Sequence, residues 1–150
     1  MPGSPDLPIA MTPIRSGLLL APLAFLLAGC LQDTASYTFP EKDHAITLVR
    51  NQTWPWESTL SLEVVAIRLP ECHEGGRVEG VKRDSAITLF KAPDEYAEPI
   101  FILQVDGKDF AVSTQSCRVQ KFEEAPPDRG QKLGVFKEKD GKFGFVAEGV

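Results

Sequence analysis

Short runs rich in apolar residues dominate the chain after residue 43. They cover residues 45–50, 59–69, 85–91, 100–105, 109–113, 117–122, 133–138 and 142–147. In most of them apolar and polar residues alternate, which places the apolar side chains on one face of a β-strand, whereas residues 100–105 are apolar on both faces and predict a strand in the centre of the sheet. Asp106-Gly107 and Asp140-Gly141 are typical of two-residue hairpin turns. The pattern therefore predicts an all-β domain over residues 44–150, a small antiparallel sandwich or barrel of seven to eight strands.

Four segments depart from the regular strand pattern. Within residues 59–69 the apolar phase changes at Val64-Val65, which predicts a bulge or a strand that crosses between sheets. Residues 70–84 are rich in glycine and charge and predict a loop. Residues 92–98 place Pro93 ahead of acidic residues, which favours one helical turn. Residues 30–43 are polar and irregular, and we expect them to form a flexible tether.

A different pattern precedes the strands. Residues 17–29 form a run of thirteen mostly apolar residues without a charge, and Arg15 lies just before it. A helix that spans a bilayer needs about 20 apolar residues, so this run is too short for a span. Its layout is that of a secretory signal peptide, which we assign to residues 1–29. Met11 is a more ordinary start for such a leader than Met1, because the first ten residues are rich in proline.

The apolar run ends in Leu27-Ala28-Gly29-Cys30. These residues resemble the lipobox of bacterial lipoproteins, in which a leucine and two small residues precede a cysteine. The resemblance implies cleavage after Gly29, a diacylglyceryl thioether on Cys30 and acylation of the new amino terminus. It places the mature protein in the bacterial cell envelope, anchored in a membrane by lipid. Leu31 rather than aspartate follows the cysteine, which favours the outer membrane and a domain that faces the periplasm.

The two remaining cysteines, Cys72 and Cys117, fit an exported protein. Disulfides persist in oxidising compartments, and an even pair in an exported domain predicts one bridge. A metal site formed by Cys72, His73, Glu74 and Cys117 is the alternative. Adjacent cysteine and histidine lack the spacing of two to four residues that lets ligands converge on zinc, so the pattern favours the disulfide.

Trp54-Pro55-Trp56 is the most unusual local sequence. One interpretation is an exposed aromatic hook for a protein, a glycan or a membrane surface, which makes Trp54 and Trp56 the candidate partner-binding residues. The other is that one indole caps the end of the fold while the second covers its rim. The second interpretation is favoured because tryptophan side chains are usually mostly buried.

Composition and motifs exclude some classes of function but do not identify a specific activity. The net charge of −5 disfavours a nucleic-acid binder, because phosphate binding depends on clustered positive charge. No nucleophile, phosphate-binding or metal-binding motif occurs in the mature part, so we expect no catalytic, metal-binding or cofactor-binding residues. The sequence favours a non-enzymatic binding or envelope-assembly role with an envelope protein or cell-wall partner. The alternative is a small envelope hydrolase, or an inhibitor of a cell-wall-degrading enzyme, with acidic residues supplied by the 71–84 loop.

Overall fold

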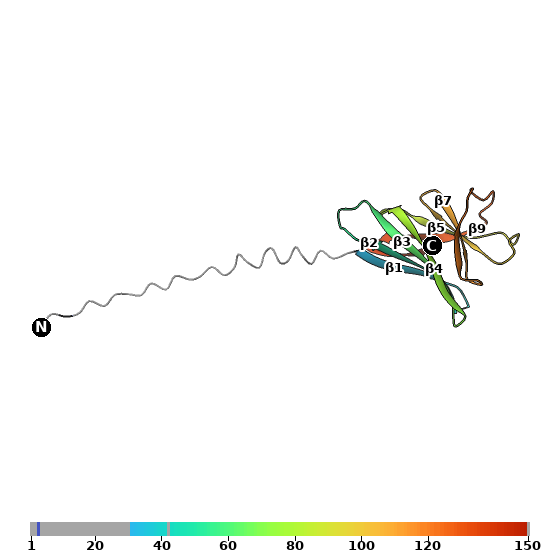
Figure 1. Ribbon diagram of the computed structural model, residues 1–150, viewed down its shortest axis with the longest axis horizontal. Coiled ribbons are helices and arrows are strands. Elements are labelled where there is room, and N and C mark those ends of the chain that lie inside the picture. Colours follow the sequence, from blue (N-terminus) through green and yellow to red (C-terminus); the bar gives the residue numbers. More distant parts are fainter. Residues whose placement is uncertain (1–2, 4–30, 42, 150) are drawn as a thin grey trace.

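The structure is a computed structural model that describes residue 3, residues 31–41 and residues 43–149. These residues form ten strands and no helix (Figure 1). The strands are β1 (Leu31–Thr38), β2 (His44–Gln52), β3 (Thr59–Arg68), β4 (Cys72–Lys82), β5 (Ile87–Lys91), β6 (Phe101–Val105), β7 (Lys108–Ser113), β8 (Arg118–Lys121), β9 (Gln131–Lys139) and β10 (Lys142–Ala147). Sheet A has the order β1-β2-β3-β4 and sheet B the order β10-β9-β5-β6-β7-β8, and all neighbours are antiparallel.

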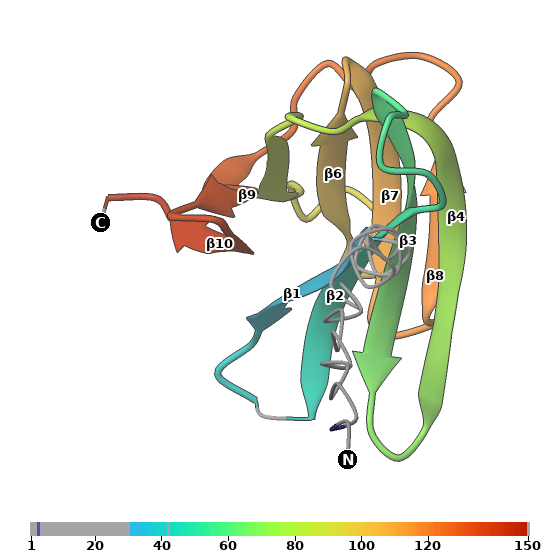
Figure 2. The ribbon, with the colours of Figure 1, turned by 90° about the vertical axis from the view of Figure 1, so that its left-hand side faces the viewer.

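The two sheets lie on opposite sides of one apolar core, in a sandwich-like arrangement (Figure 2). Fully buried core residues come from sheet A (Ile46, Leu48, Leu62 and Val64) and from sheet B (Leu89, Leu103, Val112 and Phe136). The sheets approach each other along both edges, β1 against β10 and β4 against β8. No ladder of hydrogen bonds joins the described strands across these edges, so the predicted barrel is wrong.

The eight predicted strands are all present, as β2, β3 and β5 to β10. Both predicted hairpin turns are confirmed as well. Asp106 and Gly107 have φ values of 47° and 74°, and Asp140 and Gly141 have values of 53° and 74°. Two successive residues with positive φ define the turn whose twist matches that of the flanking strands. The strongest local signals in the sequence therefore correspond to real elements.

The structure adds two strands, so the predicted count of seven to eight is too low. β1 occupies residues 31–38, where the sequence predicts a tether, and β4 occupies most of the predicted 70–84 loop. β1 pairs with β2 along its whole length, and β4 pairs with β3. Both strands are at an edge of sheet A, and the hydrogen bonds of an edge strand do not require an apolar run of its own. Hydrogen bonds to β2 and β3 therefore hold β1 and β4 as strands, although their own sequences favour loops.

Two further predictions are corrected. The inner-face residues of β3 are Leu60, Leu62, Val64 and Ala66, so the apolar phase does not change at Val64-Val65. The irregularity lies nearer the start of the strand, between the pairs Leu60–Val81 and Leu62–Val78. Residues 92–98 form turns and bends rather than a helical turn. Val65 lies on the outer face of sheet A, and its apolar side chain beside Val64 made the sequence look as if the inner face changed at this point.

Arg50 interrupts the apolar inner face of β2. Its side chain is only 3% exposed, and its guanidinium lies 4.0 Å from the centre of the Phe143 ring in β10. It donates a hydrogen bond to Asp33 of β1 at 2.6 Å and another to the carbonyl oxygen of Arg83 at 3.3 Å. Glu138 of β9 lies 3.4 Å away as a second ion-pair partner. One buried cation therefore ties both sheets and the β4–β5 connection together.

Replacing Arg50 with glutamine should lower the free energy of unfolding by about 2 kcal/mol. A desolvated cation over an aromatic ring and a charge-assisted hydrogen bond each contribute on that order, and glutamine recovers part of the hydrogen bonding. Urea unfolding followed by circular dichroism measures the loss. Arg77→Gln is the matched control, because the Arg77–Glu79 pair is exposed and 3.9 Å apart, and it should change stability by less than about 0.5 kcal/mol. Equal effects of the two substitutions would contradict a structural role for Arg50.

The predicted disulfide is present. Cys72 and Cys117 are bonded, with their Cα atoms 6.1 Å apart and a separation of 45 positions in the sequence. The bond joins the start of β4 to the turn before β8, where the two sheets meet, and nearby His44 is 3.0 Å from Thr114 between Nδ1 and Oγ1. Both sulfurs are engaged, so they do not serve as the metal ligands of the alternative interpretation. Across the described residues, no three His, Cys, Asp or Glu side chains are grouped to hold a metal ion.

Candidate binding surfaces

Trp54-Pro55-Trp56 lies in the turn between β2 and β3. Trp54 is 52% exposed and Trp56 is 76% exposed, so neither indole has the burial expected of a ring that caps the end of the fold or covers its rim. The two rings stack on each other, with centroids 5.0 Å apart and planes 18° from parallel. Pro55 cannot donate a ladder hydrogen bond, which agrees with the position of residues 53–58 outside the strands. The turn therefore presents a paired aromatic surface to the surroundings.

The buried side chain of Gln52 and the backbone and carboxylate of Glu57 make the hydrogen bonds of this turn. Gln52 is 2% exposed, and its Nε2 donates to the carbonyl oxygen of Glu57 at 2.5 Å. The Glu57 N–H donates to the carbonyl oxygen of Trp54 at 3.1 Å, which closes the turn. The Glu57 carboxylate in return accepts from the Trp54 N–H at 3.4 Å. Since none of these bonds uses an indole, changes to the two rings should alter the surface and leave the fold intact.

A polar cleft of about 310 Å³ lies beside the turn. It is lined by Asn51, Thr53, Glu57, Thr59, Leu60, Ser61, Arg77, Glu79 and Gly80. These residues come from the end of β2, the turn between β2 and β3, the start of β3 and the facing part of β4. The end of the molecule that carries the indoles is therefore polar immediately beside them, and the aromatic surface is confined to the turn.

The β6–β7 turn lies at the same end of the molecule as the tryptophan turn and is hydrogen-bonded to the end of β4 and the segment after it. Asp106 accepts a hydrogen bond from the backbone N–H of Lys82 at 2.9 Å and another from the hydroxyl of Ser85. Partial burial opposes ionisation of Asp106, but these hydrogen bonds and the charges of Lys82 and Lys108 outweigh it and lower its pKa below the usual value. A lowered carboxyl pKa stabilises the fold above the ordinary value of about 4, and this contribution is lost as the pH falls through the lowered value.

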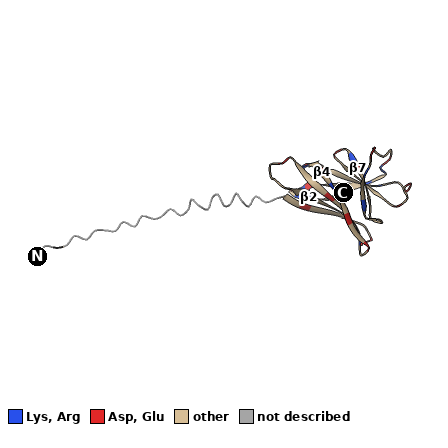
Figure 3. Cartoon of the chain, in the orientation of Figure 1, with Lys and Arg blue, Asp and Glu red and all other residues tan. Residues whose placement is uncertain are grey.

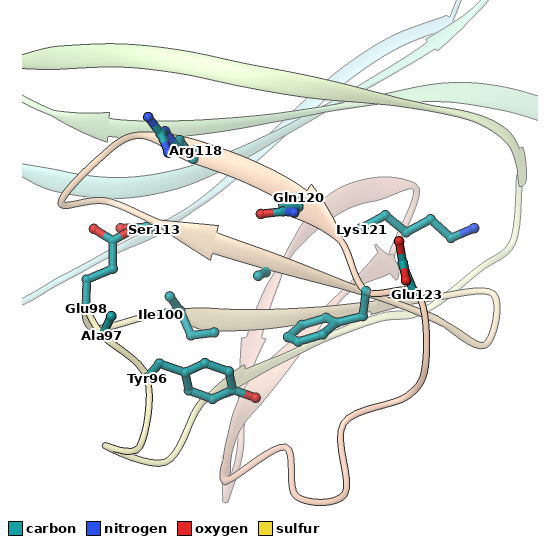
Figure 4. Close-up of a pocket in the computed structure, with 11 residues that line it drawn as sticks. Tyr96, Ala97, Glu98, Ile100, Ser113, Arg118, Gln120, Lys121 and Glu123 are labelled. Atoms are coloured by element: carbon teal, nitrogen blue, oxygen red, sulfur yellow. The ribbon is translucent and has the colours of Figure 1, made fainter.

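A second surface, a groove of about 470 Å³, lies on the outer face of sheet B (Figure 4). Tyr96 and Phe122 form an aromatic wall, with ring centroids 6.4 Å apart and planes at 68°. The remaining lining residues are Ala97, Glu98, Ile100, Ala111, Ser113, Arg118, Gln120, Lys121 and Glu123. Its lining contains both apolar and charged side chains, so the groove suits a ligand that combines an apolar group with a charged one.

Three sequence expectations have different outcomes here. Cys30 lies outside the described residues, so its lipidation stays a prediction. Trp54 and Trp56 are brought together, as an exposed pair. The acidic residues expected to converge from a 71–84 loop instead follow one another along an exposed edge strand and the turn before it. The groove was not predicted, because its residues come from three separate segments, 96–100, 111–113 and 118–123, with no local motif.

No protein-family model, no curated protein and no solved structure matches this chain. Within the described part of the chain, no helix is long and apolar enough to cross a membrane. Functional inference therefore depends on the lipobox resemblance of residues 27–30 and on the geometry of the two surfaces.

Proposed function

We propose that this protein is a bacterial lipoprotein, anchored by lipid on Cys30 in the outer membrane with its β domain in the periplasm. The observation that carries the proposal is that every strand of the described residues follows the cysteine in sequence. Strand β1 starts at Leu31, directly after the cysteine that the lipobox resemblance marks for cleavage and acylation. A leader removed after Gly29 would leave every described strand intact. The Cys72–Cys117 disulfide supports the same compartment, because such bonds persist where conditions are oxidising.

The domain's role, in this proposal, is non-enzymatic binding or envelope assembly. The sandwich-like body supplies two surfaces suited to recognition, the aromatic turn and the groove beside Tyr96 and Phe122. The partner class is an envelope protein or a cell-wall polymer. Lipid anchoring would hold the domain near such partners and raise their effective concentration, so that modest affinity suffices.

Intact-mass spectrometry of the native protein tests the anchor. The expected species begins at Cys30 and carries a diacylglyceryl group and an amide-linked acyl chain. Cys30→Ala should keep its leader, lack lipid and leave the membrane fraction after alkaline washing. The Cys72–Cys117 bond serves as an internal control, because it should form in both proteins if both are exported. A native chain with an uncut leader and an unmodified Cys30 would overturn the proposal.

Affinity capture from chemically cross-linked envelopes tests the binding role. We expect one or a few envelope components to be recovered with the wild-type protein and to be depleted several-fold with Cys30→Ala. Tyr96→Ala and Phe122→Ala, in a protein that remains lipidated, would then assign the contact to the groove. Recovery of the same components with and without lipid would contradict the idea that anchoring brings the domain to its partner.

A further inference from the structure

The aromatic turn and the expected lipid attachment point lie at the same end of sheet A. In the β1–β2 pairing, Leu31 is directly opposite Gln52, and the turn that carries both indoles follows Gln52. Adjacent strands are about 4.8 Å apart. Because Cys30 is covalently next to Leu31, a lipid on Cys30 would start beside this turn. No spacer separates them, since β1 begins at the first residue after the cysteine.

The chemistry of the turn suits the boundary between lipid and water. Tryptophan is enriched at that boundary, where its apolar ring meets the acyl region and its N–H stays hydrated. Trp54 and Trp56 are two of only three large apolar side chains that are strongly exposed among the described residues. One face of each ring lies against its partner in the stack, and the two side chains remain 52% and 76% exposed. The third such residue, Leu69, follows β3 and therefore lies at the opposite end of that strand.

The distribution of charge is consistent with the same orientation (Figure 3). Turns and strand ends on the side of the indoles carry equal numbers of basic and acidic residues: Lys82, Arg83, Lys108, Lys121, Lys139 and Lys142 against Glu57, Asp84, Asp106, Glu123, Glu124 and Asp140. Described turns and strand ends on the opposite side have an acidic excess: Glu41, Asp43, Glu71, Asp94, Glu95, Glu98 and Glu148 against Arg68, Lys91 and Arg118. Anionic phospholipids repel an acidic surface, so the balanced end is the one that can approach them.

We propose that the Trp54-Pro55-Trp56 turn inserts into the headgroup region of the leaflet that holds the lipid of Cys30. The inference rests on the proposed lipid anchor and adds an orientation to it. The lipid makes insertion of the turn an intramolecular event, so two indoles suffice where they would not recruit a free protein. The strands then extend away from the bilayer, and the acidic end of the domain faces the periplasm.

Tryptophan fluorescence of the full lipidated protein tests this orientation. The chain contains two tryptophans and both are in the turn, so the emission reports on the turn alone. The protein is reconstituted in vesicles of phosphatidylethanolamine and phosphatidylglycerol, with or without lipids brominated near the headgroup. Brominated lipids should quench the emission to less than about half, because an inserted indole lies beside the bromine atoms. Unquenched emission that remains fully accessible to aqueous iodide would overturn the inference.

A relocated indole is the matched control. Trp54→Phe/Trp56→Phe/Leu69→Trp carries its single indole at the far end of β3, about 30 Å from the turn for a ten-residue strand. Its emission should be unaffected by brominated lipid, whereas Trp54→Phe alone, which keeps Trp56, should be quenched like the wild type. Equal quenching of the relocated indole would mean that the domain lies flat, and would overturn the proposed orientation.

The mass of Cys30 in the same samples separates two kinds of failure. A lipidated, vesicle-bound protein with an unquenched turn would overturn the orientation and leave the anchor standing. An unlipidated protein that does not bind vesicles would overturn both. If the turn is unquenched in vesicles and becomes shielded from iodide only when envelope proteins are added, the indoles bind a protein and the membrane assignment is wrong.

Discussion

Removal of the Cys72–Cys117 disulfide should lower the free energy of unfolding by about 4 kcal/mol. In the chain-entropy model, a bond that closes a loop of 45 residues restricts the unfolded chain by about that amount. Typical domains are stable by only about 5–15 kcal/mol, so a loss of this size is a large share of the stability of such a domain. Urea unfolding of the double variant Cys72→Ala/Cys117→Ala, followed by circular dichroism, measures the effect.

Reduced wild-type protein is the control that isolates the cross-link from lost packing. Cys117 is only 1% exposed, so alanine at this position also removes buried volume. Reduction keeps both sulfurs and breaks only the bond, and most of the loss should therefore appear in the reduced wild type. The β4 amides should exchange with solvent faster on reduction, because β4 is an edge strand held on one side by β3. A reduced protein as stable as the oxidised one would show that the loop is already restricted in the unfolded chain.

The strands that the sequence predicts are those in which apolar residues recur at strand spacing. β2, β6, β7, β9 and β10 have apolar side chains at regular positions, and two hairpins are marked by Asp-Gly turns. β1 and β4 carry no comparable signal, because their stability comes from hydrogen bonds to the neighbouring strands β2 and β3. Pairing between segments distant in sequence is decided by the whole sheet, and local periodicity does not report it.

Some features of the candidate sites could also be predicted from the sequence, and others could not. Exposure of Trp54 and Trp56 runs against the usual burial of tryptophan, and it agrees with the position of Pro55 outside the strands. Arg50 carried a usable signal, because it continues the inner-face register of Ile46 and Leu48. A charged residue at an apolar position of a strand predicts a buried ion pair. The groove beside Tyr96 has no signal in the sequence, because its walls come together only when the sheet has formed.

The pair Asp109–Arg129 should be the most sensitive charged contact in the domain. The Asp109 side chain is 1% exposed and accepts two hydrogen bonds from Arg129, at 2.7 and 2.8 Å. These hydrogen bonds and the charge of Asp109 raise the pKa of Arg129, against a smaller opposing effect of burial. The Asp109 carbonyl oxygen also accepts the Phe122 N–H at 2.9 Å. Asp109 thus holds both ends of the 122–129 segment, one of which forms a wall of the groove.

Arg129→Gln should lower the free energy of unfolding by about 3 kcal/mol, because it leaves a buried carboxylate without its charged partner. The double variant Asp109→Asn/Arg129→Gln should be more stable than Arg129→Gln alone, since it removes the unpaired charge as well. Lys132→Gln breaks the exposed Lys132–Glu148 pair, which is 2.9 Å apart, and should cost less than about 0.5 kcal/mol. Urea unfolding of the three variants measures these differences. If Arg129→Gln and Lys132→Gln were equally mild, the Asp109 carboxylate would have to reach water when Arg129 is lost, and the 122–129 segment would be held by its backbone contacts instead.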